Sequence, residues 1–305
     1  MQDTMEERKA GHIPPQQGRT PHFRISRSVA VLFCLASMFS IQLGASLSLG
    51  VMENFGSYTT TWIRLCFAAV IVYLIARPNF LSFDRRQWVA ALSLGAAMAL
   101  MTTSVFAAIQ SAPLGLVIAI NFLGPISVAL LGLSGYRAYT WPALSLVGVL
   151  LIAYNGTAWV TDTRGLLFSF GAAIGWAGYI LLMKRVGSQF KGLQGLSVSL
   201  LSAALIMTPI GLSSATELRN PELFLYGAGL AILVPLLPYI LEMQALRQLS
   251  SMSFGLLMSV EPAIGALLGF LILSQALSTM QVVGVVCVVA ASIGALRNQQ
   301  SAAKP

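Results

Sequence analysis

Residues 254–273, FGLLMSVEPAIGALLGFLIL, form an apolar run whose one ionisable side chain is Glu261. A run of this kind is long enough to cross a bilayer as a helix, which takes roughly 20 residues. At about 1.5 Å per residue, Glu261 lies about 15 Å from Ser251, near the middle of a hydrocarbon core about 30 Å thick. A charged carboxylate that faces lipid there costs at least ~2.5 kcal/mol. We therefore expect Glu261 to face a cavity, to be protonated or to be paired, as in a transport pathway. The alternative is a structural carboxylic acid that is hydrogen-bonded between helices.

The composition of the whole chain is that of a membrane protein. Of its 305 residues, 56% are hydrophobic and only 9% are charged, and the mean hydropathy is +0.79. A soluble domain carries about 25% charged residues. The net charge of +8 does not indicate nucleic-acid binding, because almost all Lys and Arg residues fall in loops and tails. The three cysteines have no CxxC spacing and both histidines lie in the N-terminal tail, so we expect no metal site and no cofactor.

The apolar runs predict an all-α polytopic membrane protein with ten transmembrane helices. Residues 1–27 are polar and contain prolines, which favours a disordered cytoplasmic tail over a signal peptide. Residues 298–305 are expected to form a second cytoplasmic tail. The expected spans are about 28–50, 58–76, 88–109, 114–133, 141–156, 165–184, 193–212, 223–243, 252–273 and 280–296.

The distribution of basic residues gives the expected orientation. With ten spans and the N-terminus inside, the outer loops hold only Arg164 and Arg219. Apart from Arg64, which falls within a span, every other Lys and Arg then lies on the cytoplasmic side, which is the positive-inside pattern. Nine or eleven spans would destroy this pattern, so we expect both termini to be cytoplasmic.

The two halves of the chain resemble each other. Residues 112–125, APLGLVIAINFLGP, align with residues 252–262, MSFGLLMSVEP, in a register that matches Asn121 with Glu261. These stretches belong to the fourth and ninth spans, which cross the membrane in opposite directions. Five spans in each half predict two inverted five-helix repeats, 28–156 and 165–297. Substrate sites in such folds lie near the midplane, at the repeat interface.

Few polar side chains are expected inside the membrane. Gln42, Asn121 and Glu261 are candidates to converge on one cavity. Gln42 shares a helix face with Ser46, and hydrogen bonding between helices is the alternative role for both. Arg64 lies about 9 Å below the outer edge of its span. It either extends to the outer headgroups or pairs with a carboxylate of the protein or of the substrate.

The eighth span contains a further carboxylate and two prolines. Pro235 and Pro238 each remove a backbone donor, so the helix should be interrupted just before Glu242. Glu242 belongs either to an inner gate or to the membrane interface as an ordinary carboxylate. Three aromatic residues with polar tips either line the cavity or pack as ordinary core residues: Trp176, Tyr179 and Tyr239.

Several stretches together resemble the drug/metabolite transporter superfamily of the EamA type. The resemblance extends from about residue 30 to 297 and is closest to the threonine/homoserine exporter family of bacterial inner membranes. It implies a ten-helix fold and proton-coupled efflux of small amino acids. The family pattern has Glu where this chain has Asn121, so one of two symmetric carboxylates is absent. The matching stretches are 40–46 (SIQLGAS), 64–65 (RL), 109–115 (IQSAPLG), 175–181 (GWAGYIL), 237–246 (LPYILEMQAL) and 254–263 (FGLLMSVEPA).

The residues and the resemblance together predict a secondary transporter rather than an enzyme. We expect it to export threonine-like or homoserine-like amino acids, or related metabolites, from the bacterial cytoplasm by proton antiport with alternating access. Its partners are then the small-molecule substrate, protons and the lipid bilayer. Glu261, as the one ionisable side chain placed near the midplane, would carry the proton. Glu261 or Asn121 would meet the substrate ammonium group, and Arg64 or a helix N-terminus its carboxylate.

Other functions are compatible with parts of the sequence. The chain could export another class of compound, such as aromatic amino acids, nucleosides or cationic compounds. A passive channel would show no dependence on a pH gradient. A membrane-embedded enzyme is disfavoured because no histidine is placed in the membrane, and the absence of GxxxxGK[ST] excludes a P-loop ATPase. The sequence carries no signal for an oligomeric state.

The predicted orientation can be tested with reporter fusions. A reporter that is active only in the periplasm should be silent when it is fused after Arg297 and active when it is fused at Asp162. The reverse activities would overturn the ten-span topology.

Overall fold

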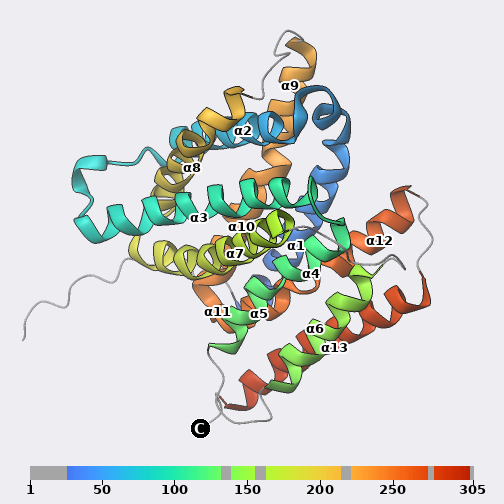
Figure 1. Ribbon diagram of the computed structural model, residues 1–305. Helices are drawn as coiled ribbons and strands as arrows, with labels where there is room; N and C mark the ends of the chain where they lie inside the picture. The colour runs from blue at the N-terminus through green and yellow to red at the C-terminus, as the bar shows by residue number, and fades with distance from the viewer. Residues whose placement is uncertain (1–25, 132–138, 155–162, 214–220, 274–277, 303–305) are drawn as a thin grey trace, which may run out of the picture.

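The computed structural model describes residues 26–131, 139–154, 163–213, 221–273 and 278–302 (Figure 1). Seven helices account for most of it: α1 (Arg27–Leu47), α2 (Leu49–Ala76, kinked at Gly56), α3 (Arg85–Ile109), α6 (Thr140–Ala153), α7 (Thr163–Gln189), α8 (Gln194–Ser213) and α13 (Thr279–Ala302). The short helix η1 (Phe80–Ser82) connects α2 with α3. Most of the expected N-terminal tail and the expected junction between the repeats lie outside the described residues. The helix α13 extends to Ala302, so part of the expected C-terminal tail is helical.

Three spans consist of consecutive shorter helices. The fourth is α4 (Leu114–Asn121) followed by α5 (Leu123–Leu130). The eighth is α9 (Pro221–Ala231), η3 (Ile232–Leu236) and α10 (Leu237–Gln248), and the ninth is α11 (Ser251–Met258) and α12 (Glu261–Leu273). Within the described ranges, seven helical stretches are long and apolar enough to cross a membrane, and three further apolar helices are shorter. The prediction of an all-α polytopic membrane protein is confirmed.

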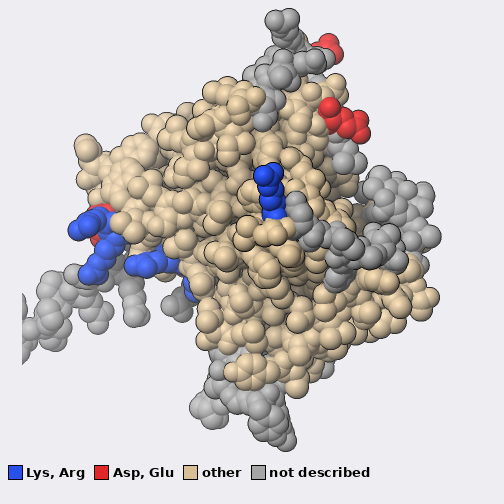
Figure 2. Space-filling view, viewed as in Figure 1, with Lys and Arg blue, Asp and Glu red and all other residues tan. Residues whose placement is uncertain are grey.

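The surface of the bundle is apolar, as a lipid-facing surface must be. Figure 2 shows a face that is largely free of charged side chains, with several Lys and Arg residues gathered at the end where α3 begins. Large apolar side chains are exposed along the helices, including Leu74, Ile174 and Leu205. A soluble monomer rarely exposes contiguous apolar surface of this kind.

The interruption of the eighth span lies at the first of its two prolines. Val234, immediately before Pro235, has an extended backbone (φ −148°, ψ 115°) inside η3. Pro238 lies in the first turn of α10. Backbone N–H groups in a first turn have no partner within the helix, so the N–H that proline lacks costs no helical hydrogen bond there. Irregular backbone at membrane depth is tolerated only where protein or a cavity surrounds it.

The fourth and ninth spans break at matching positions. The helix α4 ends at Asn121, and α12 begins at Glu261. These are the residues that the internal sequence alignment pairs. Helix ends leave backbone groups without intrahelical partners, so both breaks place polar groups in the interior of the bundle.

The helices pack in a pattern that relates the two halves. The third span contacts the sixth (α3 with α7), and the eighth contacts the first (α10 with α1). The second contacts the seventh (α2 with α8), the fourth the ninth (α5 with α11), and the fifth the tenth (α6 with α13). Exchanging the first five spans for the last five reproduces every one of these pairs. The pattern supports the proposed five-helix repeats, whose boundaries at 28–156 and 165–297 stay a prediction.

Close backbone approach between α3 and α7 depends on a glycine. A Cβ atom at Gly175 would lie 2.6 Å from the backbone nitrogen of Met101. A Cβ atom at Gly178, one turn further along α7, would lie 3.7 Å from the Cβ of Ala97, an ordinary contact. Small residues of this kind let membrane helices pack closely.

We expect Gly175→Ala to destabilise the bundle, because the added methyl group forces α7 away from α3. Overpacking of this kind costs about 1–3 kcal/mol. The measurement is thermal unfolding of the detergent-solubilised protein, with Gly178→Ala as the matched control on the same helix. Equal unfolding temperatures for the two variants would show that the close approach of α3 and α7 does not determine the stability of the bundle.

Candidate functional site

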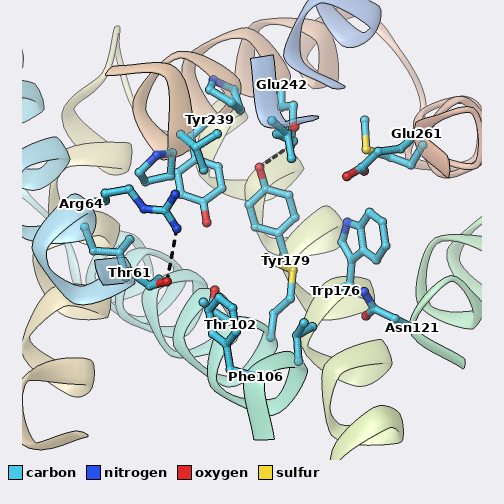
Figure 3. A pocket seen from close by; sticks show the side chains of 18 residues that line it. Thr61, Arg64, Thr102, Phe106, Asn121, Trp176, Tyr179, Tyr239, Glu242 and Glu261 are labelled. Carbon is cyan, nitrogen blue, oxygen red and sulfur yellow. Dashed lines mark hydrogen bonds between the residues drawn. The ribbon is translucent and has the colours of Figure 1, made fainter. Parts of the chain in front are cut away.

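The bundle contains a cavity of about 250 Å³ that is lined by residues from both halves of the chain. Its volume is slightly below the range of about 300–1,000 Å³ that is typical of pockets for drug-sized ligands. A cavity of this size therefore suits a small metabolite. Its ionisable lining includes one cation and two carboxyl groups, which come from three different helices: Arg64, Glu242 and Glu261 (Figure 3).

The cavity lies in the interior of the bundle and extends toward one end of it. Its lining includes Ile41 in the last third of α1 and Phe106 near the end of α3. The helix α7 runs antiparallel to α3, since Gly171 faces Ser104 whereas Gly178 faces Ala97. The cavity therefore extends toward the end at which α1 and α3 finish, while Arg64, Tyr179 and Glu242 line it from the middle of α2, α7 and α10.

The opposite end is held together by two basic side chains. The Nζ of Lys184 on α7 donates to the backbone carbonyl groups of Leu246 (2.5 Å) and Leu249 (2.7 Å), where α10 ends. In the other direction, Arg247 on α10 donates to the carbonyl groups of Gly187 (3.0 Å) and Gly192 (2.6 Å). Cations are favourable at helix C-termini because they satisfy free carbonyl groups there. These bonds join the ends of α7 and α10, five residues beyond Tyr179 and Glu242 of the cavity lining.

Arg64 is a buried cation and not a headgroup anchor. Its side chain is 4% exposed, which contradicts extension to the outer headgroups. Its Nη1 donates to the hydroxyl of Ser48 (2.8 Å) and its Nη2 to that of Thr61 (3.3 Å), whereas its Nε has no partner. Among the described residues it forms no ion pair, so the cavity contains a guanidinium group that lacks a counter-charge. Thr61 precedes Arg64 by three positions on one helix face, a spacing that could have identified it from the sequence.

Glu242 is a cavity residue and not an interfacial carboxylate. It is 3% exposed, and the hydroxyl of Tyr179 donates to its Oε2 at 2.5 Å. The rings of Tyr179 and Tyr239 pack at a centroid distance of 5.5 Å. All three side chains line the cavity.

Glu261 and Asn121 lie on the side of the cavity opposite Arg64, with Trp176 beside them (Figure 3). Glu261 is partly exposed, and the described residues offer its carboxylate no hydrogen bond. The Oδ1 of Asn121 is buried without a partner. Phe122 packs edge-on against Trp176 at a centroid distance of 4.7 Å, which fixes the indole ring at the cavity wall. The structure thus brings together Asn121 and Glu261 as expected, but Glu261 is not the only ionisable group there.

Gln42 is placed differently from the sequence-based expectation. It does not line the cavity, and its side-chain amide packs against α12, where a Cβ at Gly265 would lie 3.0 Å from Nε2. The hydroxyl of Ser46 donates to the backbone carbonyl of Gln42 at 2.9 Å, within α1. Gln42 therefore packs between α1 and α12, and the bond of Ser46 stays within α1, so hydrogen bonding between helices stays a prediction for both. In the part of the chain that the structure describes, no three His, Cys, Asp or Glu side chains come together as metal ligands would.

Accessibility of the cavity can be measured on α3. Thr102 lines the cavity, whereas Leu94, two turns earlier on the same helix, is fully buried. In a background whose three cysteines are replaced by alanine, we expect Thr102→Cys to react with a small hydrophilic thiol reagent. Leu94→Cys should react at least about tenfold more slowly, because its thiol lies in the packed core. Equal rates of labelling, followed by mass spectrometry, would contradict this placement of the cavity.

Comparison with known proteins places this architecture among transporters. The model of the EamA-like transporter family matches residues 163–297. The threonine/homoserine exporter RhtA of Escherichia coli (strain K12) is 34% identical over 266 residues, which cover 87% of this chain and 90% of RhtA. The RhtA exporter of Salmonella typhimurium (strain LT2) has the same identity and coverage. An uncharacterized transporter of Clostridium kluyveri is 25% identical over 161 residues.

A solved crystal structure confirms the fold independently. It superimposes with a TM-score of 0.73 and covers 90% of this chain and 99% of its own. Because the two sequences are 17% identical, this likeness concerns the fold alone.

Proposed function

Since this chain belongs to the EamA-like transporter family and shares 34% identity with threonine/homoserine exporters, we propose that it exports small amino acids of the threonine or homoserine type. The protein is a multi-pass membrane transporter, and we place it in a bacterial inner membrane with both termini in the cytoplasm. Export is by proton antiport with alternating access.

The observation that carries the substrate class is the unpaired charge on each side of the cavity. A buried guanidinium without a counter-charge costs several kcal/mol of desolvation, and Arg64 has only two hydroxyl partners. A substrate carboxylate supplies the missing charge. On the opposite side, the carboxylate of Glu261 and the amide of Asn121 receive the ammonium group. A zwitterion is the class of small molecule that satisfies both sides.

The remaining lining suits a short side chain. The hydroxyls of Thr61 and Thr102 can bond a substrate hydroxyl, and Met101 and Val105 provide apolar contact. Arg64 and Glu261 lie across the cavity from each other (Figure 3). A zwitterion held between them therefore draws α2 and α12 together, and binding favours closure of the cavity.

The asymmetry of the bundle supports alternating access. The cavity extends toward the end at which α1 and α3 finish, and the bonds of Lys184 and Arg247 hold the ends of α7 and α10 together. With both termini in the cytoplasm, the described conformation is the outward-facing one, from which the substrate leaves. Movement of one five-helix repeat against the other, around the broken fourth and ninth spans, then opens the cytoplasmic side.

The function is tested with purified protein in proteoliposomes. We expect exchange of radiolabelled threonine or homoserine across the membrane, and at least a tenfold lower rate for Arg64→Gln. The loss follows from one charge-assisted contact, about 1.5–3 kcal/mol, at 1.4 kcal/mol per factor of ten.

Arg77→Gln is the control, because Arg77 is an exposed residue at the end of the same helix. It should exchange threonine within about twofold of the wild type. Transport of nucleosides or cationic compounds without any amino acid would overturn the assignment, as would equal rates for the two arginine variants.

A further inference from the structure

We propose that the two carboxyl groups of the cavity have separate roles, with Glu242 binding the proton that is exchanged and Glu261 binding the ammonium group of the substrate. This inference rests on the proposed function and deepens it. It replaces the sequence-based expectation that Glu261 carries the proton.

The surroundings of Glu242 suit a proton and exclude a larger ligand. The side chain is 3% exposed, so a substrate ammonium group has almost no surface to contact. The hydroxyl of Tyr179 engages Oε2 at 2.5 Å, and the hydroxyl of Ser37 is a second hydrogen-bond partner of the carboxyl group. In the described ranges no Lys or Arg forms an ion pair with it. A buried carboxylate without a cation is costly, and binding a proton removes that cost without requiring space.

The surroundings of Glu261 suit a cationic ligand. Its carboxylate is partly exposed, points into the cavity, and has no hydrogen bond from the described residues (Figure 3). It is the first residue of α12, a helix of 13 residues. The positive end of a helix dipole favours a negative charge at that position, whereas Glu242 lies in the middle of α10 and has no such support. Glu261 is therefore the carboxyl group that a cationic ligand in the cavity can reach.

The other titratable groups around Glu242 are neutral when they hold their protons. They come from every helix that faces it: Cys34 on α1, Tyr179 on α7 and Tyr239 on α10, with Arg64 and Glu261 as the charged groups across the cavity. In the empty cavity, the charges of one cation and two carboxyl groups balance when one carboxyl group holds a proton. The empty, protonated cavity is therefore neutral.

The proximity of the two carboxyl groups couples the proton to the substrate. Glu242 and Glu261 interact electrostatically, and Cys34 is within reach of both. An ammonium group at Glu261 stabilises the charged form of Glu242 and so favours release of its proton. By linkage, a proton on Glu242 weakens substrate binding by the same factor. Competition of this kind is what exchange of a proton for a substrate requires.

Tyr179 is a positioning residue for this site. Its hydroxyl joins α7 to α10, the two helices that Lys184 and Arg247 also join five residues further along each helix. A change in the charge of Glu242 therefore acts on the pair of helices that these contacts hold together.

Two measurements in proteoliposomes separate the roles. The first is the half-saturating concentration of threonine in counterflow, and the second is the ratio of threonine flux with and without an imposed pH gradient. For Glu261→Gln we expect at least a tenfold higher half-saturating concentration. For Glu242→Gln we expect a shift of less than about threefold, while the flux ratio falls to one.

A second pair of variants tests the site without removing a carboxyl group. The hydroxyl donor favours the charged form of Glu242, so Tyr179→Phe should move the midpoint of the pH profile of gradient-driven flux upward. Tyr239 lines the same cavity, but its hydroxyl is not the one that bonds Glu242. The substitution Tyr239→Phe should therefore move this midpoint less than Tyr179→Phe does. This pair carries the test if Glu242→Gln is not recovered as folded protein.

The outcomes distinguish this inference from the function on which it rests. Wild-type protein that carries no amino acid overturns the proposed function. Threonine transport that ignores the gradient overturns the antiport and this inference with it. The separate roles are overturned if Glu261→Gln alone abolishes the gradient response, if both variants lose affinity equally, or if Tyr179→Phe leaves the pH profile unchanged.

Discussion

A charged side chain inside an apolar bundle must be satisfied by polar neighbours, by a ligand or by a change in its protonation. Arg64, Glu242 and Glu261 come from three helices and meet at one cavity. Arg64 donates to the hydroxyls of Ser48 and Thr61, and Glu242 is hydrogen-bonded by the hydroxyls of Tyr179 and Ser37. These contacts leave a cation and a carboxylate without counter-charges. The need to neutralise them is the physical reason for a zwitterionic substrate and an exchangeable proton.

The broken helices are the structural counterpart of this requirement. A continuous helix satisfies its own backbone and presents only side chains, whereas a break provides free backbone groups and dipole ends in the interior. Asn121 and Glu261 lie at two such breaks, one in each half of the chain. The third break, at Val234 and Pro235, lines the same cavity. The site is therefore built at the places where the fold departs from regular helices.

The sequence predicted the parts of this architecture that depend on length and depth. Counting apolar residues located the spans, and the depth of Glu261 alone indicated an internal site. The sequence did not define which way a side chain faces. For Glu242 the sequence left open an inner gate or an interfacial carboxylate, and only the structure shows that the side chain is buried at the cavity. The irregular segment η3 also changes the helical phase before α10. Gln42 has suitable depth but faces Gly265 instead of the cavity.

The central claim is that the cavity recognises both charges of a small amino acid. The most direct test uses the wild-type protein and measures how well two analogues of threonine compete with threonine in counterflow. One analogue is the amino alcohol, which lacks the carboxylate, and the other is the hydroxy acid, which lacks the ammonium group. Each should compete at least about tenfold less well than threonine, because one charge-assisted contact is worth about 1.5–3 kcal/mol. Competition by either analogue as strong as that of threonine would contradict the account.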